Sequence, residues 1–343
     1  MLRLKQKALP IAVAVTITGA AFSSAHAEKT VTLTMANWVP PVHHLTHTLT
    51  GWIAAVKKES GGTLIIKLDK GAVAKPPGMY DVAKNGIRDI AWGVAGYTPG
   101  RFPLYRTLEL PFLSPNAEIG SVAMWDWYTR NGLDKKEITD TKLITVWVHG
   151  PGVVHSKKPI HTLADMQGVK FRVGGGGVQI AKLLGGVPVP MSATKAHESL
   201  RRGTTDGTLF PYEAIKGFRL AKLVHYHLEI PGGIYATPFF MVMNLNSWNK
   251  LSAKHKAVLM KVGGAWGARY IGKHWDAADA EGKRVAKAAG NKFSTISPAE
   301  LKVWKAKLQP MYADWKKTVS AKGNDADALL KDLRETIAKY NKK

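Results

Sequence analysis

An alternation of short apolar strands with amphipathic helices, running from residue 30 to residue 94, limits the possible folds more than any other feature of this chain. Strand patterns occupy 30–36 and 64–68, and a short buried strand is expected at 89–94. Apolar residues recur at helical spacing from Leu45 to Val56, and a second helix is expected at 79–85. This order predicts a mainly parallel sheet flanked by helices.

A second series of strands and helices follows. We expect helices at 117–129, 177–184 and 194–202, and strands at 143–149 and 169–173. The apolar strand at 239–244 is assigned back to the first domain. The last third is expected to be helical. Ser297 and Glu300 form a capping box there, and Asn324 with Asp327 is expected to cap the final helix.

The two series predict an α/β protein with two lobes, as in periplasmic binding proteins, with a ligand cleft between the lobes and C-terminal helices that brace them. The expected parts are a signal peptide at 1–27, a first lobe at 28–150 plus about 236–275, a second lobe at 151–235, and C-terminal helices at 276–343. Ligands bind at the carboxyl ends of parallel strands in such sheets. Closure of two lobes around a solute is a recurrent mechanism.

The N-terminus has the pattern of a cleavable signal peptide. Three basic residues precede an apolar stretch at 8–22, and residues 25–27 have the small-x-small pattern of a cleavage site. The apolar stretch is shorter than the ~20 residues that a membrane-spanning helix requires. The alternative is an uncleaved anchor. We expect export to the periplasm and a mature chain that starts at Glu28.

Charge and cysteine content narrow the possible functions. The formal net charge is +24, and without the three basic residues of the signal peptide it is +21, so the mature chain attracts anions. The basic residues are scattered and form no zinc-finger, RNP or basic-helix pattern, so no nucleic acid is expected as a partner. The chain has no cysteine, which excludes thiol catalysis, disulfides and cysteine metal sites.

A strand followed by glycines contains the first candidate for ligand binding. Arg172 lies near the end of an expected strand, and four glycines at 174–177 lead into a helix. Backbone N–H groups at a helix start attract anions, and an arginine can clamp a carboxylate through two hydrogen bonds. The alternative for Arg172 is a surface salt bridge. Neither G-x-G-x-x-G nor a P-loop motif is present here, so a nucleotide site is not indicated.

Three motifs around this strand resemble a known family. An Asp-x-x-Gly-x-Lys-x-Arg run ends at Arg172, Leu-Gly-Gly-Val-Pro follows at 184–188, and Gly-x-x-Asp-Gly ends at Gly207. In order and spacing they resemble the DctP-type substrate-binding proteins of tripartite ATP-independent periplasmic (TRAP) transporters, and the resemblance covers nearly the whole mature chain. It implies a two-lobe fold with a long bracing helix, a carboxylate ligand held by Arg172, and a permease partner in the inner membrane.

The departures from the family pattern concern the ligand. Many members have a ligand-contacting asparagine where this chain has Phe210, and sialic-acid-binding members have a second arginine where it has Gly152. A polar sugar acid would lose several hydrogen bonds here, each worth about 1 kcal/mol. An aromatic body would gain a stacking surface from Phe210. We therefore expect an aromatic or otherwise apolar carboxylate.

Aromatic residues and one histidine at expected strand ends are further candidates for the lining of the cleft. They are Trp38, Trp92, Tyr97, Trp147, His149 and Tyr235. Trp38 and Tyr97 are expected on loops, where binding residues are frequent. For Trp92 and Trp147 the alternative is a place in the hydrophobic core, since tryptophan is buried on average.

Histidine spacing and catalytic motifs do not indicate a metal site or an enzyme. His43 and His47 lie four residues apart at the start of the first helix, but two ligands do not make a zinc site, and H-E-x-x-H is absent. His225 and His227 alternate on a possible strand. No G-x-S-x-G elbow occurs, and acids such as Asp206 are isolated. We expect no metal, no cofactor and no catalytic residue.

The sequence therefore predicts an extracytoplasmic solute-binding subunit of a TRAP-type transporter. We expect a monomer that binds a small organic acid and delivers it to membrane permease subunits. Three alternatives stay open. A ligand-sensing subunit of a signalling receptor would have nearly the same sequence, a periplasmic enzyme would turn over its anionic substrate, and a surface adhesin would bind polyanions in a salt-sensitive way.

Overall fold

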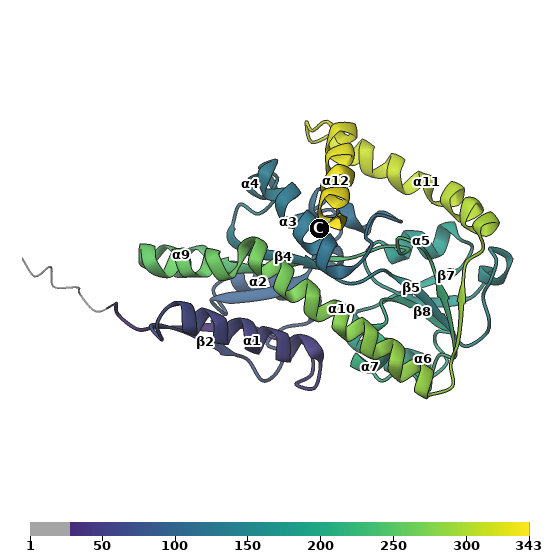
Figure 1. The fold of residues 1–343 in the computed structure, drawn as a ribbon, viewed down its shortest axis with the longest axis horizontal. Coiled ribbons are helices and arrows are strands. Elements are labelled where there is room, and N and C mark those ends of the chain that lie inside the picture. Colours follow the sequence, from purple (N-terminus) through teal and green to yellow (C-terminus); the bar gives the residue numbers. More distant parts are fainter. Residues whose placement is uncertain (1–27, 343) are drawn as a thin grey trace, which may run out of the picture.

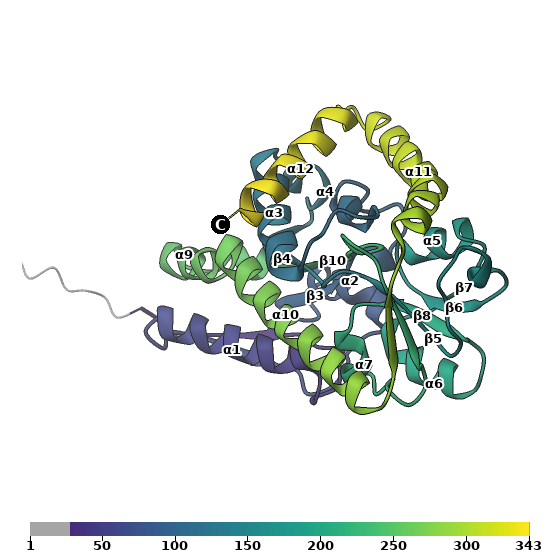
Figure 2. The same cartoon turned by 45° about the vertical axis from the view of Figure 1, so that its right-hand side comes forward.

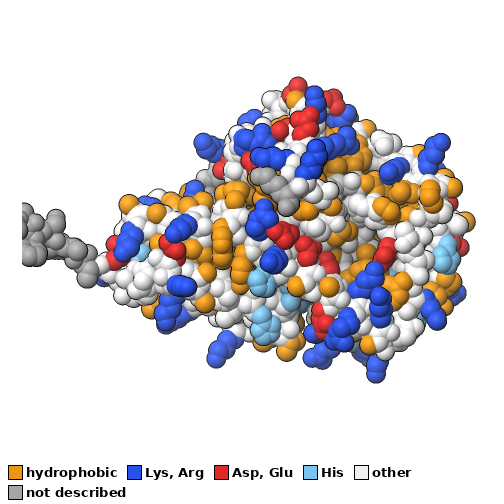
Figure 3. Space-filling model, viewed as in Figure 1, with side chains coloured by type: hydrophobic (Ala, Val, Ile, Leu, Met, Phe, Trp, Pro, Cys, Tyr) orange, Lys and Arg blue, Asp and Glu red, His pale blue; other side chains and the backbone are white. Residues whose placement is uncertain are grey.

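The computed structural model describes residues 28–342, and the predicted signal peptide lies outside them. The described chain forms two β-sheets with helices packed around both (Figure 1). No helix in this part of the chain is long and apolar enough to span a bilayer. The Lys and Arg side chains are spread over the face seen in Figure 3 and do not gather in one patch.

The first sheet has five strands in the order β2-β1-β3-β10-β4. Their bounds are β1 (Val31–Met35), β2 (Leu64–Leu68), β3 (Ile90–Val94), β4 (Thr141–Val148) and β10 (Pro238–Asn244). The positions of these five strands confirm the positions predicted from the sequence. β1 pairs in parallel with β2 and β3, but β10 lies antiparallel between β3 and β4. The sheet is mixed instead of mainly parallel because β10 comes back from the second sheet and inserts in the opposite direction.

The second sheet has six strands in the order β11-β9-β5-β8-β6-β7. Their bounds are β5 (Val153–Ser156), β6 (Lys170–Val173), β7 (Val187–Pro190), β8 (Gly207–Phe210), β9 (Tyr226–Glu229) and β11 (Lys292–Thr295). β5 pairs antiparallel with β8 and β9, and the other pairs are parallel. The pattern predicts β6 and indicates β9, but it misses the other strands, because four residues are too few for a clear alternation.

Helices surround the two sheets (Figures 1 and 2). The longer helices are α1 (His44–Glu59), α3 (Ala117–Arg130), α9 (Ala253–Val262), α10 (Gly264–Ala288), α11 (Pro298–Ser320) and α12 (Ala326–Asn341). The shorter helices are α2 (Met79–Lys84), α4 (Asp134–Glu137), α5 (Gly177–Leu183), α6 (Ala196–Arg201), α7 (Glu213–Gly217) and α8 (Leu245–Asn249). Short 3-10 helices lie at Pro76–Gly78, Ala95–Tyr97, Tyr105–Glu109, Ala164–Met166 and Ala193–Lys195.

The long helix α10 connects the two halves of the molecule. It runs from α9 beside the first sheet to α7 beside the second (Figure 2). The Asp276 carboxylate accepts hydrogen bonds from Ala117 N (2.7 Å) and Glu118 N (2.9 Å) at the start of α3. The Asp279 carboxylate accepts one from Glu213 N (2.7 Å) at the start of α7. Since helix starts leave N–H groups unpaired, two carboxylates one turn apart fix α10 to both halves.

Glycines bring α10 close to its neighbours. A Cβ at Gly282 would lie 2.0 Å from Tyr212 O, and a Cβ at Gly272 would lie 2.7 Å from Ala117 O. The bracing helix thus begins at Gly264 and passes without a break through the boundary predicted after residue 275. All of the lobe boundaries stay a prediction.

The C-terminal segment 289–342 contains the two predicted helices, and before them β11, a strand that was not predicted. The predicted cap of α11 is confirmed, since Ser297 Oγ accepts from Glu300 N (3.2 Å). The cap of α12 is Asp325, which accepts from Ala328 N (2.9 Å), and not Asn324 with Asp327. A capping side chain must directly precede the first helical turn to reach its N–H groups, and Asp325 holds that position.

The two C-terminal helices pack on both halves of the molecule. Trp127 Nε1 of α3 donates to Leu329 O of α12 (2.9 Å). On α11, Asp314 accepts from Gln179 Nε2 of α5 (2.7 Å), and Trp315 Nε1 donates to Thr107 Oγ1 (3.1 Å). These contacts join α11 to segments that lie beside different sheets, which agrees with the bracing role predicted for the C-terminal helices.

Candidate ligand-binding site

A cavity lies beside the ends of strands from both sheets. Six of the residues predicted for the site line it: Trp38, Tyr97, His149, Arg172, Phe210 and Tyr235. The lining also includes Phe239 and residues that were not predicted to contact a ligand, among them His43, Glu213, Phe218, Thr237 and Trp275. Half of the lining residues have an aromatic ring, when the two histidines are counted.

Arg172 is a buried cation on β6, with 2% of its surface exposed. Its Nη2 donates to Met191 O (2.7 Å) and to Tyr97 Oη (3.4 Å), and its Cζ lies 4.1 Å from the centroid of the Phe210 ring. Its Nε has no hydrogen-bond partner. Within residues 28–342 Arg172 forms no ion pair with a carboxylate. A buried charge without a counter-ion is costly, so this arrangement favours an anion.

Tyr97 and Phe210 hold the guanidinium from two directions. The Tyr97 hydroxyl accepts from Ala193 N (2.9 Å), so a residue that follows β3 of the first sheet contacts the second half of the molecule. The Phe210 ring lies under Arg172 and stacks on Phe218, with centroids 5.8 Å apart and planes at 20°. The orientation of Arg172 is therefore set before any ligand arrives.

His149 and Tyr235 present ring surfaces to the cavity, because their polar atoms are bonded elsewhere. His149 Nε2 accepts from Thr237 N (3.0 Å), and Nδ1 lies 2.5 Å from Gly150 O. Burial lowers the pKa of His149 to about 4, so the ring is neutral and Nδ1 carries the hydrogen. The Tyr235 hydroxyl donates to Leu209 O (2.9 Å), and the two rings meet edge to face at 4.9 Å.

Packing leaves no room for a second arginine at Gly152. A Cβ at this position would lie 2.5 Å from Cδ1 of Tyr235. Any side chain larger than hydrogen would have to displace that ring, which lines the cavity. In sialic-acid-binding proteins this position holds an arginine. In this chain the ring of Tyr235 fills the space that such a side chain would need.

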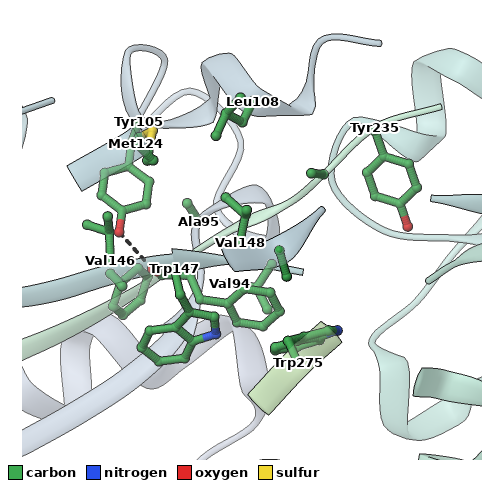
Figure 4. Close-up of a cluster of buried hydrophobic side chains, with 14 of the residues drawn as sticks. Val94, Ala95, Tyr105, Leu108, Met124, Val146, Trp147, Val148, Tyr235 and Trp275 are labelled. Atoms are coloured by element: carbon green, nitrogen blue, oxygen red, sulfur yellow. Dashed lines mark hydrogen bonds between the residues drawn. The ribbon is translucent and has the colours of Figure 1, made fainter. Parts of the chain in front are cut away.

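The structure does not bring Trp92 and Trp147 to the cavity surface. Both are fully buried, and they lie one layer behind the lining. Trp92 packs 4.8 Å from Trp38, and Trp147 stacks on Phe239 at 5.5 Å with planes 6° apart. Figure 4 shows Trp147 within a cluster of buried hydrophobic side chains, with Trp275 near it. Trp92 lies on the central strand β3 and Trp147 on the edge strand β4, and both are buried in the core, so they support the lining without belonging to it.

The glycine run at 174–177 meets a carboxylate of the chain itself. Glu109 is buried against it, and a Cβ at Gly175 would lie 2.4 Å from Glu109 Oε1. Burial raises the pKa of Glu109, while Arg106 and a hydrogen bond from the backbone of Gly176 oppose that shift. Arg106 Nε donates to Glu109 Oε2 (2.6 Å). The backbone N–H of Gly176 thus serves Glu109, the N–H of Gly177 donates to Gly174 O (3.0 Å), and Arg172 is the candidate for the ligand.

His43, His44 and Glu213 form a buried polar cluster at the edge of the cavity. Glu213 Oε2 lies 3.4 Å from His43 Nε2 and 3.3 Å from His44 Nε2. The donor atoms of the three side chains lie within 4.8 Å of one another, which is a spacing that a metal ion accepts. However, His43 Nδ1 accepts from Leu45 N (3.2 Å), so in the neutral ring Nε2 carries the hydrogen and has no lone pair for a metal. The cluster is two imidazoles facing a carboxylate.

The residues that the sequence analysis missed carry only weak signals. Trp275 lies in the middle of α10, where an aromatic residue is ordinarily part of a helix–helix interface. Glu213 lies three residues after Phe210, the last residue of β8. Its proximity to the Gly-x-x-Asp-Gly motif that ends at Gly207 is the one feature of the sequence that distinguishes it from other acids.

The family of the chain follows from a comparison with known proteins. Residues 35–318 match the DctP family, described as bacterial extracellular solute-binding protein, family 7. The chain belongs to this family. The match to the DctP family spans strands of both sheets, the whole of α10 and most of α11, so it includes every residue described for the cavity.

Solved structures of DctP relatives resemble the chain along most of its length. A TRAP periplasmic solute-binding protein from Bordetella bronchiseptica with bound (R)- and (S)-mandelate is 30% identical, with a TM-score of 0.87, over 90% of this chain and 99% of that one. A TRAP solute-binding protein from Rhodoferax ferrireducens with copurified benzoate is 32% identical, with a TM-score of 0.85, over 91% and 99%. One from a marine metagenome with 3-hydroxybenzoate is 31% identical, with a TM-score of 0.86, over 91% and 99%.

These comparisons confirm the predicted two-lobe α/β fold and the predicted kind of protein. The relatives are solute-binding proteins of transporters and not enzymes, so this DctP protein is a TRAP-type solute-binding protein. The DctP family is periplasmic, and its members bind small organic acids and work with membrane permease components.

Proposed function

We propose that this DctP protein is exported to the periplasm, binds an aromatic or otherwise apolar carboxylate through Arg172, and delivers it to the permease subunits of a TRAP transporter. The observation that carries the proposal is the buried guanidinium of Arg172, which faces an aromatic cavity and has no carboxylate partner among the described residues.

The electrostatics of Arg172 support an anionic ligand. A carboxylate would restore the counter-charge that burial demands, and Arg–carboxylate hydrogen bonds are about twice as strong as neutral ones. The contacts to Met191 O and Tyr97 Oη use only Nη2, which leaves Nε and Nη1 for the ligand. The guanidinium is already oriented by Phe210, so little conformational entropy is lost when the ligand binds.

The lining of the cavity supports an apolar body for the ligand. Trp38, Phe210, Tyr235 and Phe239 offer ring surfaces, and the hydroxyl of Tyr235 is already bonded to Leu209 O. Relatives that are about 30% identical hold mandelate, benzoate and 3-hydroxybenzoate. A sugar acid would find few partners for its hydroxyl groups along these walls.

Binding is proposed to couple to closure of the two lobes. Ligand enters between them, Arg172 pairs with its carboxylate, and closure excludes water from the ion pair. The permease then recognises the closed, monomeric protein. Residues 1–27 are proposed to direct export, with cleavage before Glu28. A ligand-sensing subunit of a receptor would use the same site, and uptake of the ligand by cells would distinguish the transporter.

The test is a calorimetric titration of the mature protein, refolded to remove any ligand carried through purification. Benzoate and mandelate should bind, and Arg172→Ala should weaken binding by at least about 30-fold, since removing one partner of a buried charge pair costs 2–5 kcal/mol or more. Arg201→Ala, which removes an exposed arginine paired with Glu198, is the matched control and should bind like wild type. Binding of aromatic acids that survives Arg172→Ala would refute the proposed role of Arg172.

A further inference from the structure

We propose that Glu213 and His43 form a second polar contact in the cavity, which binds a hydroxyl group on the ligand and rejects a second carboxylate. The preferred solute is then a hydroxylated aromatic monocarboxylate. This inference rests on the proposed function, because it assumes that Arg172 holds the first carboxylate.

Glu213 is an acid placed inside the ligand cavity. It is the first residue of α7, and 4% of its surface is exposed. Its Oε2 has no hydrogen-bond partner within residues 28–342. The two nearest polar atoms, His43 Nε2 and His44 Nε2, lie at 3.4 and 3.3 Å, beyond the usual range of about 2.7–3.2 Å for a hydrogen bond from N–H to oxygen. Glu213 Oε2 is therefore a buried acceptor that receives no hydrogen bond of ordinary length.

The protonation of His43 follows from its place at the start of α1. His43 Nδ1 accepts from Leu45 N, so the neutral ring carries its hydrogen on Nε2. Burial lowers the pKa of His43 to about 4, which keeps the ring neutral at pH 7. His43 Nε2–H, which also lacks a hydrogen-bond partner in the described chain, therefore faces Glu213 Oε2.

The charge of Glu213 follows from the same contacts. Burial alone would raise its pKa, but the facing His43 and His44 more than offset this, and the pKa lies below its ordinary value. An ionised carboxylate accepts hydrogen bonds and donates none. The cavity therefore contains two charges of opposite sign, Arg172 and Glu213, and both side chains line the same space.

A hydroxyl group is the chemical group that satisfies this pair of atoms. It can donate to Glu213 Oε2 and accept from His43 Nε2–H at the same time. Trp275 Nε1 is a further N–H in the lining without a hydrogen-bond partner in the described chain. A methoxy group could accept but not donate, so it would leave Glu213 unpaired. A second carboxylate would meet the charge of Glu213, and like charges brought together cost several kcal/mol.

The test compares substituted benzoates by isothermal titration calorimetry on the refolded mature protein. The ligands are benzoate, 3- and 4-hydroxybenzoate, 3- and 4-methoxybenzoate, isophthalate and terephthalate. In wild type, the better hydroxybenzoate should bind about tenfold more tightly than benzoate and than the matching methoxy compound, as expected for one hydrogen bond to a charged group. Both dicarboxylates should bind at least about 100-fold more weakly than benzoate.

Two variants separate the role of Glu213 from a general effect of charge. In Glu213→Gln the ratio between hydroxybenzoate and benzoate should fall below about threefold, and affinity for the better dicarboxylate should rise at least about tenfold as the repulsion disappears. Glu335→Gln removes the same charge from an exposed residue outside the cavity lining, and both ratios should stay as in wild type. Because each ratio is taken within one protein, a change in overall stability cancels.

The outcomes distinguish this inference from the proposed function. If benzoate binds through Arg172 but neither hydroxybenzoate binds more tightly, the inference is overturned and the proposed function stands. An unchanged ratio in Glu213→Gln also overturns it. If none of the aromatic acids binds wild type, the proposed function fails and the inference fails with it.

Discussion

The two sides of the cavity contribute different chemistry. On the side of the first sheet, Trp38, Tyr97 and Phe239 present rings, and both nitrogens of His149 are bonded to the backbone. On the side of the second sheet lie the two charged side chains of the lining in the described chain, Arg172 and Glu213. The comparison indicates that the first side selects the shape of a ligand and the second selects its charged and polar groups.

Acid is expected to destabilise the first side through His149. The pKa of His149 is lowered by burial to about 4 in the folded protein, whereas an unfolded chain has about 6.5. Between these values the unfolded state binds more protons, so the free energy of unfolding falls as the pH drops, by up to about 3 kcal/mol for this residue. Urea unfolding at pH 7 and pH 4.5 should show a smaller loss in His149→Gln than in wild type. Equal losses would mean that His149 is not the group that titrates.

Arg172→Lys and Tyr97→Phe compare the two sides directly. Lysine keeps the charge but loses the planar fork, so affinity for benzoate should fall about 30-fold, equivalent to about 2 kcal/mol. Tyr97→Phe removes the hydroxyl that contacts Arg172 and Ala193, and a loss of about fivefold is expected, in line with one hydrogen bond. Calorimetric titration measures both. If Tyr97→Phe loses more affinity for benzoate than Arg172→Lys does, the roles assigned to the two sides of the cavity are reversed.

Gly282→Ala tests whether the close packing of α10 fixes the relative position of the two sides of the cavity. The new Cβ would lie 2.0 Å from Tyr212 O, next to the start of α7 and Glu213. We expect the free energy of unfolding to fall by about 1–3 kcal/mol, as for other overpacked sites. Gly71→Ala is the control, because a Cβ there meets no atom within 4 Å. If urea unfolding gives the same stability for both variants, α10 does not depend on this close contact.

Phe210→Leu should have an effect as small as that of Tyr97→Phe, and it sharpens the assignment of the second side. The ring lies 4.1 Å from Arg172 Cζ, and loss of the cation–π contact and the stacking surface is worth about 1 kcal/mol. The affinity for benzoate should fall about fivefold, while cyclohexanecarboxylate, which has the same outline without a π-face, should change less. Equal losses for the two acids would show that Phe210 acts by volume alone.

The first sheet was predictable from local sequence, and much of the second was not. β1, β2 and β3 have apolar patterns of five residues and helices between them, and their positions are confirmed. β7 contains Pro188 and Pro190, which is compatible with its place at the edge of its sheet but gives no strand signal. Strands of four residues form because partners distant in the chain pair with them, and no local pattern records that pairing.

The candidate site divides in the same way. Arg172 and Phe210 were found through a motif and a departure from it, and both line the cavity. Trp92 and Trp147 were expected there and lie behind it, while Trp275 and Glu213 line it without a signal of their own. The local sequence around a tryptophan looks the same whether the residue lines the cavity or lies in the core behind the lining. Its position therefore depends on which element packs over it.

The sequence by itself determined the strands and helices that form the first sheet, the arginine near the end of β6, and the replacement of a polar position by Phe210, because these depend on spacing along the chain. The tertiary structure alone decided that Glu109 packs against the glycine run and bonds to the N–H of Gly176, that Gly152 is closed by Tyr235, and that His43 faces Glu213. Each of these contacts joins residues about 65 or more positions apart or from different sheets, and only packing brings such residues together.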